Sequence, residues 1–244
     1  MKMLTFAKRC TKEILRDPLN LMFGLGFPIV LLLLLSAIQA NIPVDLFKIE
    51  VLAPGITIFG LSFISLMSAT LISKDRESSF LQRLYTTPLR SIDFILGYML
   101  PLIPISVMQS TICYLVSFAL GLPITIEVLY AILMIIPISV FYISFGLFCG
   151  SVLNVKQVGG ICGALLTNLS AWLSGIWFDL ELVGGTFKKI ANCLPFIHAV
   201  ELEKIIVSGN YTQSLSHIII ILIYSVLMLI LSILMFLKQS KNKQ

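Results

Sequence analysis

The chain has 244 residues, of which 58% are hydrophobic and only 12% are charged, and its mean hydropathy is +1.00. Soluble domains carry about 25% charged residues, so most of this chain is too apolar to face water. The composition excludes a soluble enzyme and a nucleic-acid-binding domain, and it predicts an all-α, polytopic membrane protein. The 17 Lys and Arg residues lie in short clusters between apolar runs, as topology determinants do, and not along one phosphate-binding face.

The first segment, residues 1–18, has the pattern of an amphipathic helix. Its apolar positions fall on one helical face: Met3, Ala7, Cys10 and Ile14. The basic residues lie mostly on the other faces, and Pro18 interrupts the pattern. We expect this helix to lie on the inner leaflet with its apolar face at the acyl boundary. It could act as a topology anchor or as a contact for a partner protein.

Six uncharged runs are long enough to cross a hydrocarbon layer, which takes roughly 20 apolar helical residues. They are residues 19–40, 51–72, 94–120, 128–153, 158–178 and 216–237. These runs make up more than half of the chain, so we expect a single transmembrane domain over residues 1–244 with no separate globular domain.

Basic residues divide unevenly between the loops on the two sides of these runs. Thirteen lie in the terminal segments and in the loops after the second and fourth runs, whereas four lie on the other side: Lys48, Lys188, Lys189 and Lys204. By the positive-inside rule, both termini are expected in the cytoplasm, at the plasma membrane, and segment 179–215 is expected outside.

The six runs contain no Asp, Glu, Lys or Arg, and both histidines, His198 and His217, lie outside the runs or at an edge. Proton-coupled carriers and membrane-embedded enzymes usually need ionisable groups or metal ligands at depth, so we expect no catalytic residue and no metal site. The five cysteines show no CxxC spacing and are interpreted as small apolar fillers. No GxxxxGK[ST] motif is present, so ATP hydrolysis is expected on another chain.

Small residues recur within the runs at helix-packing spacing. Glycines stand four residues apart at Gly146 and Gly150, and again at Gly159 and Gly163. Serines punctuate the second run at Ser62, Ser65 and Ser68. Close helix packing is the favoured interpretation, because small residues let two backbones approach. The alternative for the three serines is that they line a transport pathway.

The loop 73–93 is the most informative segment. Large apolar residues recur in it at helical spacing, ahead of Pro88: Phe80, Leu81, Leu84 and Tyr85. We expect a short cytoplasmic helix over 77–86, which must bury this apolar face against lipid or protein. The mixed charges beside the apolar face favour protein.

Several residues of this loop form a recognisable series: Asp75, Arg76 and Glu77, then Phe80, Leu81, Arg83 and Leu84, then Thr87 and Pro88. The series resembles the coupling-helix signature of type-two ABC transporter permeases, especially the daunorubicin-resistance-like exporters. The chain has Ser78-Ser79 where that family has a glycine-threonine pair, and Gln82 where the family has Glu. The resemblance implies that these residues contact an ATPase.

A second resemblance to the same family lies between residues 174 and 211. Phe178, Pro195 and His198 occupy positions in the family's order of a Gly-hydrophobic-Phe segment followed by Leu-Pro-x-x-His-Ala. Apolar residues at helical spacing from Phe187 to Leu194 end at Pro195. We therefore expect an external, re-entrant helical hairpin over 179–215.

The resemblance implies the membrane subunit of an ATP-driven exporter for an amphipathic drug, antibiotic or peptide. A second permease subunit, in a homodimer or heterodimer, would complete the pathway through the lipid membrane. Two copies of a separate ABC ATPase would bind ATP and Mg. The alternatives are an exporter of a lipid or lipid-linked glycan, a non-transporting membrane sensor or scaffold, and, least in keeping with the missing ionisable groups, a membrane-embedded enzyme.

Overall fold

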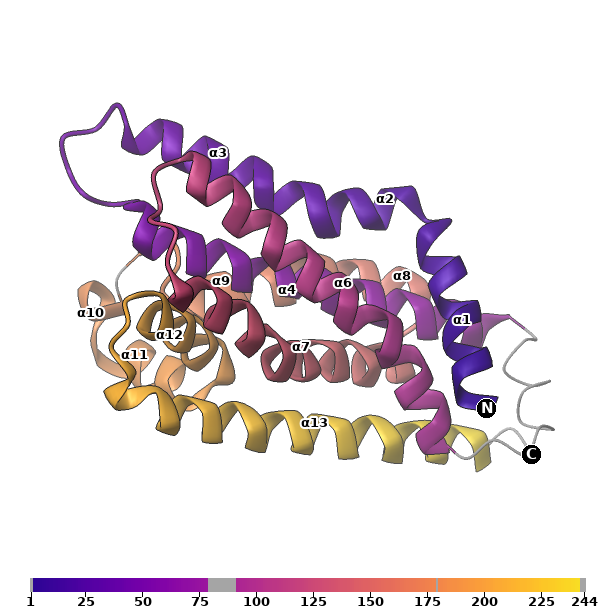
Figure 1. Ribbon diagram of the computed structural model, residues 1–244. Coiled ribbons are helices and arrows are strands. Elements are labelled where there is room, and N and C mark those ends of the chain that lie inside the picture. The colour runs from indigo at the N-terminus through magenta and orange to yellow at the C-terminus, as the bar shows by residue number, and fades with distance from the viewer. Residues whose placement is uncertain (1, 79–90, 179, 242–244) are drawn as a thin grey trace.

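The computed structural model describes residues 2–78, 91–178 and 180–241, and these residues form a bundle of long helices without a strand among them (Figure 1). The helices, in chain order, are α1 (Lys2–Leu15), α2 (Pro18–Leu21), the π-helical η1 (Met22–Gly26), α3 (Phe27–Gln39), α4 (Ile49–Glu77), α6 (Ser91–Ala119), α7 (Ile126–Val152), α8 (Val155–Val158), the π-helical η2 (Gly159–Leu166), α9 (Thr167–Leu173), α10 (Leu180–Val183), α11 (Gly185–Cys193), α12 (Pro195–Val207), the 3-10 turn η3 (Tyr211–Gln213) and α13 (Ser214–Lys241).

Five helical stretches in the described part of the chain are long and apolar enough to cross a membrane. They are Pro18–Gln39, Ile49–Glu77, Ile92–Ala119, Ile126–Val152 and Tyr211–Lys238. These stretches confirm five of the six predicted runs as membrane-length apolar helices. The remaining run, 158–178, corresponds to the stretch from α8 through η2 to α9, which follows α4 from one end of the bundle to the other (Figure 1). That stretch is not among the five, so a sixth span stays a prediction.

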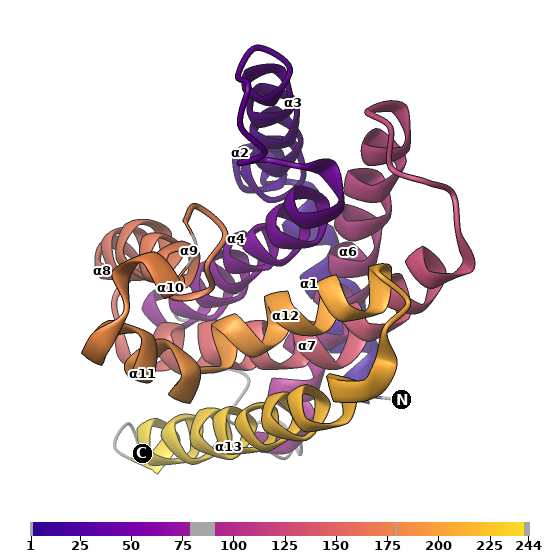
Figure 2. The ribbon, with the colours of Figure 1, turned by 90° about the vertical axis from the view of Figure 1, so that its left-hand side faces the viewer.

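The helix α4 forms the centre of the bundle. In the apolar part of α4, 89% of the residues are buried. In the apolar parts of the first and last of the five stretches, 22% of the residues are buried. Viewed along the bundle, α4 lies between α3 and α7, and α13 lies on the far side of α7 (Figure 2). The exposed faces of α3 and α13 carry large apolar side chains, including Val30, Leu34, Val226 and Leu234, which are suited to contact lipid.

The approach of α4 to α7 depends on two glycines of α7. A Cβ added at Gly146 would overlap the carbonyl oxygen of Ser65, and one added at Gly150 would overlap the carbonyl oxygen of Ala69. This confirms the packing role predicted for the first glycine pair. The second pair differs, because a Cβ at Gly159 would meet nothing within 4 Å. Gly159 begins η2, whose backbone does not approach α4 in this way.

The helix α1 is amphipathic, but protein covers its apolar face. Phe6 and Cys10 are buried in the core of the bundle, and the Phe6 ring meets Phe94 and Tyr98 edge-on, with ring centroids 5.5 and 4.9 Å apart. A Cβ added at Gly97 would collide with the same ring. The helix α6 therefore covers the face that the sequence assigned to the acyl boundary.

The helices α10, α11 and α12 lie at the end of the bundle opposite α1 (Figure 1). There α11 packs against α12, and α12 packs in turn on α4, α7 and α13. Pro195 is the first residue of α12, a position whose backbone N–H would have no intrahelical hydrogen-bond partner. The location of this segment outside the membrane stays a prediction.

The two glycine environments give a matched test of the α4–α7 contact. We expect Gly146→Ala to lower the free energy of unfolding by about 1–3 kcal/mol, because the new methyl group must push two backbones apart. Gly160→Ala is the control, since a Cβ there would meet nothing within 4 Å. The measurement is the midpoint of thermal unfolding in detergent. Equal midpoints for the two variants would contradict the packing role.

Candidate coupling site at one end of the bundle

The first three residues of the predicted coupling series, Asp75, Arg76 and Glu77, form the last turn of α4. The other members of the series lie outside the described residues: Phe80, Leu81, Arg83, Leu84, Thr87 and Pro88. The same is true of most of the helix expected over 77–86. The structure therefore shows how the beginning of the loop is attached to the bundle.

Asp75 joins α4 to α1 and α6. Its side chain is buried, and Arg9 of α1 donates to both carboxylate oxygens, with Nη2 lying 2.6 Å from Oδ1 and Nη1 bonded to Oδ2. The hydroxyl of Tyr98 in α6 donates to Oδ2 at 2.7 Å. Bidentate, charge-assisted bonds of this kind are among the stronger polar contacts in proteins. Three helices are thus held at one carboxylate.

The charges around Arg9 reinforce this junction. Burial alone would lower the pKa of Arg9, but its hydrogen bond to Asp75 and the negative charge there raise it above the ordinary value. Arg9 Nη2 also lies 2.6 Å from Glu13 Oε2, while burial, followed by the nearby charge of Asp75, raises the pKa of Glu13. Burial raises the pKa of the Cys10 thiol to about 12, so this neighbour stays neutral. Arg9 therefore remains the cation of the cluster.

The next two residues bind the ends of neighbouring helices. Arg76 Nη1 donates to the carbonyl oxygens of Gly150 at 2.7 Å and Leu153 at 3.0 Å, in the last turn of α7 and directly after it. Glu77 Oε1 accepts from the backbone N–H of Val155 at 2.8 Å, at the start of α8. Helix ends leave such backbone groups without intrahelical partners, and a cation at the C-terminal end and an anion at the N-terminal end suit the helix dipole. Each residue of the triplet thus contacts a different part of the fold.

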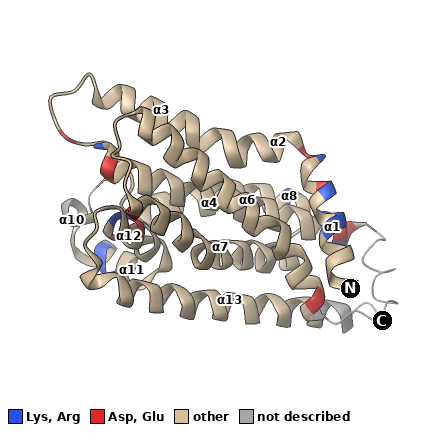
Figure 3. Ribbon diagram, in the orientation of Figure 1, with Lys and Arg blue, Asp and Glu red and all other residues tan. Residues whose placement is uncertain are grey.

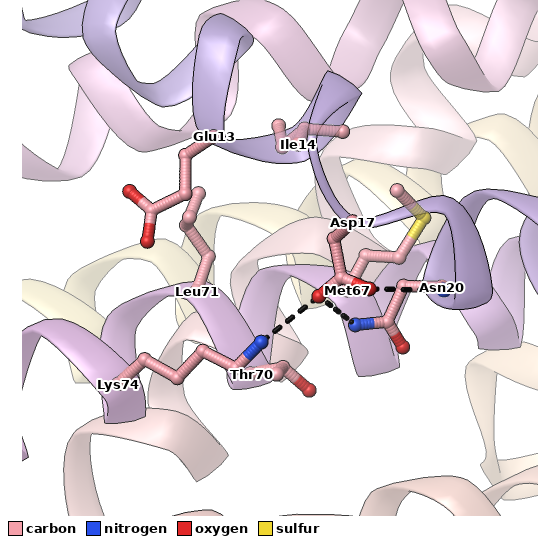
Figure 4. A pocket seen from close by; sticks show the side chains of 8 residues that line it. All are labelled: Glu13, Ile14, Asp17, Asn20, Met67, Thr70, Leu71 and Lys74. Carbon is pink, nitrogen blue, oxygen red and sulfur yellow. Dashed lines mark hydrogen bonds and ion pairs between the residues drawn. The ribbon is translucent and has the colours of Figure 1, made fainter.

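A second ion pair is formed by Lys74, the residue of α4 directly before Asp75 (Figure 4). Lys74 Nζ lies 2.9 Å from Asp17 Oδ2, and the same carboxylate accepts from the backbone N–H and the side-chain amide of Asn20 at 3.3 and 2.8 Å. Burial alone would raise the pKa of Asp17, but the bonds from Lys74 and Asn20 lower it below the ordinary value. The cavity between these residues has a volume of about 20 Å³, room for about one water molecule. It is a gap in packing and too small for a transported compound.

Figure 3 shows that the charged residues gather at the two ends of the bundle and leave its middle free of charge. At the α1 end, the described charges are mostly paired with one another or with helix termini. No group of three or more His, Cys, Asp or Glu side chains in the described ranges is placed to hold a metal ion. The end of α4, from which the loop continues, is thus attached to α1, α6, α7 and α8.

The three serines of α4 are all fully buried. Ser62 Oγ donates to the carbonyl oxygen of Phe59 at 2.6 Å, within α4, and Ser68 Oγ donates to that of Ile143 in α7 at 3.1 Å. Ser65 supplies the backbone carbonyl against which Gly146 packs. These contacts are those of helix packing, while a pathway-lining role for the serines stays a prediction.

The remaining predicted residues lie at the opposite end of the bundle, away from the coupling site. The Phe178 ring lies 6.3 Å from that of Phe187, and Pro195 is buried at the start of α12. His198 Nδ1 lies 2.9 Å from Nδ1 of His217, and His198 Nε2 lies 2.9 Å from the carbonyl oxygen of Asn192. These residues fix α12 to α11 and α13.

Sequence reasoning missed Arg9 and Tyr98 as partners of Asp75. Arg9 was grouped with the basic residues that orient the chain, and Tyr98 was one aromatic among many in an apolar run. A signal did exist, because an acid at the end of a buried helix needs a cation. Choosing Arg9 among the nearby basic residues requires knowing that α1 packs on α6.

The ion pair predicts a specific pattern of mutant stabilities. We expect Arg9→Ala to destabilise the protein by about 3 kcal/mol, because it leaves the Asp75 carboxylate buried without a cation. The double variant Arg9→Ala with Asp75→Asn should recover much of that loss, since no buried charge then remains. Lys8→Ala, at an exposed position of the same helix, is the control. Additive effects of the two substitutions in thermal unfolding would show that the pair is not coupled.

Comparison with known proteins supports the resemblance noted for the loop and for the segment after residue 174. Residues 1–207 match the family model of the ABC-2 type transporter. No individual curated protein matches the chain. The family match covers the described coupling site and all but α13 and the turn before it. The chain therefore belongs to the ABC-2 type transporter family and is a multi-pass membrane permease of the ABC exporter type.

Proposed function

We propose that the chain is the membrane-spanning subunit of an ATP-driven exporter in the plasma membrane, with both termini in the cytoplasm. Two permease subunits form the pathway, and two separate ABC ATPase subunits supply ATP binding and hydrolysis with Mg. The transported compound is an amphipathic drug, antibiotic or peptide. The observation that carries the proposal is the junction at the end of α4, within the matched family region.

This junction suits a chain that receives force from a partner. Asp75, Arg76 and Glu77 tie the start of the loop to four other helices through charged groups that a movement of the loop would pull directly. In the proposal, the ATPase binds the segment 79–90 and its closure is passed to the bundle through these contacts.

An apolar pathway is consistent with an amphipathic substrate. The middle of the bundle carries no charge among the described residues, so a strongly hydrated ion would lose its water without compensation there (Figure 3). The same walls would accept a lipid. Efflux of amphipathic dyes from cells, compared with movement of labelled lipids between leaflets of vesicles, separates the two substrate classes.

The coupling role predicts that partner binding depends on the loop. We expect Leu81→Asp to abolish co-purification with the ATPase, because an unpaired carboxylate would be buried at the contact. Leu46→Asp is the matched control, since Leu46 is an exposed apolar residue in the loop before α4, at the other end of the bundle. Co-purification and drug efflux are measured for both variants at equal expression. Unchanged binding of the ATPase by Leu81→Asp would refute the assigned contact, and a stable chain for which no ATPase partner is found would favour a sensor or scaffold.

The proposed topology makes a separate prediction. A single cysteine introduced at Lys8 should react with a membrane-impermeant reagent only from the cytoplasmic side, because α1 belongs to the basic side of the protein. One introduced at Thr212, which is exposed at the opposite end, should react only from outside. Both are made in a background without native cysteines, and labelling of intact cells is compared with labelling of inside-out vesicles. The reverse labelling pattern would overturn the orientation.

A further inference from the structure

The helix α12 separates a surface cavity from the interior of the bundle. On one side, Ile197, Glu201 and Lys204 line a cavity of about 590 Å³, together with Trp177 and Phe178. On the other side, α12 lies against α4 and α7 (Figure 2). Its buried residues include Phe196, Ala199, Val200, Leu202, Glu203 and Ile206. The interior can reach the cavity on this side only if α12 moves.

One residue on the inner side of α12 is ionisable. Glu203 is fully buried, and its Oε2 accepts a hydrogen bond from the hydroxyl of Tyr114 in α6 at 2.6 Å. Its Oε1 has no hydrogen-bond partner among the described residues. A carboxylate with one hydrogen bond and no cation is costly to bury, whereas a protonated carboxyl group with the same bond is far less so. The geometry therefore favours the neutral acid.

The surroundings of Glu203 offer no other way to neutralise it. Tyr114 is the group that faces it from α6, and the group beyond Tyr114, Thr57 of α4, is uncharged. No charge from the described parts of α7, α9, α11 or α13 acts on Glu203. On its own helix, Lys204 pairs with Glu201 at 2.9 Å on the cavity side. Burial accordingly raises the pKa of Glu203 to about 8, although the bond from Tyr114 acts in the opposite direction.

We propose that Glu203 is a proton-binding site that latches α12 over the bundle: the carboxyl group holds a proton while α12 is packed and releases it to water when α12 lifts. The step is a simple acid dissociation, in which the Glu203 O–H bond breaks, the electron pair stays on the carboxylate and the proton passes to solvent. Opening this end of the permease is then linked to the release of one proton per chain.

The sign of the pH dependence follows from the two environments. In the packed state the pKa is about 8, and in water it is near the ordinary value of 4.5. Below about pH 4.5 both states hold the proton, so the packed state carries no penalty. Between about pH 4.5 and pH 8 only the packed state holds the proton, so the equilibrium constant for opening rises by up to tenfold for each pH unit. Above about pH 8 both states are ionised and the effect levels off.

The test measures how often the inner face of α12 becomes accessible. Ala199 lies one turn before Glu203 and is buried, so Ala199→Cys in an otherwise cysteine-free full-length chain reports when this face opens. Its rate of reaction with a maleimide is measured in detergent from pH 5 to 9, with Glu203 and with Glu203→Gln, which cannot ionise. The ratio of the two rates cancels the ionisation of the thiol itself. We expect this ratio to rise several-fold per pH unit up to about pH 8 and then to level off.

Two further variants keep the test decisive. Glu201→Gln, on the cavity side of the same helix, should leave the pH profile of the Glu203 protein unchanged. Glu203→Met provides a second neutral reference if the Gln variant does not fold. A rate ratio independent of pH, or a profile abolished equally by Glu201→Gln, would overturn the proposal. The labelling rate is measured without ATPase or substrate, so the result holds even if the proposed export function is refuted. Conversely, export could be established while the ratio of labelling rates does not change with pH.

Discussion

The contact between α4 and α7 sets the geometry on which the rest of the bundle depends. Gly146 and Gly150 let the two backbones approach until the Ser68 hydroxyl of α4 reaches the carbonyl oxygen of Ile143 in α7. The opposite face of α7 is bonded in a similar way, because Ser232 of α13 donates to the carbonyl oxygen of Ser144 at 2.7 Å. With no water at this depth, such bonds are the polar contacts that remain between helices. The helix α7 is thus fastened on both sides through its backbone.

The two ends of the bundle use charge in opposite ways. At the α1 end, Arg9 and Asp75 neutralise each other and hold three helices together. At the other end, Glu203 is buried beside a phenol and no cation, and it can be neutral only with a proton bound. The first arrangement balances its charges within the protein, whereas the second, in our proposal, has a strength that depends on the pH of the medium.

The sequence predicted the helical class and five of the membrane-length helices, because an uncharged run of about 20 residues has few other ways to fold. The run 158–178, in which Thr167, Asn168 and Ser170 interrupt the apolar pattern, is not among these five helices, and its crossing of the membrane stays a prediction. The sequence also predicted an amphipathic α1 but assigned its apolar face to lipid, since periodicity shows that a face is apolar without showing what covers it. This last limit applies to every contact between segments distant in sequence.

Periodicity does not show which distant segments touch, and this limit also decides which residues of the candidate sites could be predicted. The triplet at Asp75 was recognised by its resemblance to a family, but its partners on α1, α6, α7 and α8 follow from tertiary packing. Glu203 was overlooked because it stands between Glu201 and Lys204 in a segment expected outside the membrane, where an acid draws no attention. Only the packing of α12 shows that Glu203 is buried while Glu201, two residues earlier, is partly exposed.

The π-helical η2 also fixes the number of residues in the stretch from α8 to α9, which packs along α4. Before and within η2, Val158 and Cys162 pack beside Ala69, whereas beyond it Ala171 packs beside Phe59, nearer the other end of α4. A π-helical turn holds one more residue than an α-helical turn, so it rotates the later face relative to the earlier one. Removing a single residue here would turn Ala171 by about 100° away from α4. In this stretch, substitution of a side chain is tolerated more readily than the insertion or deletion of a residue.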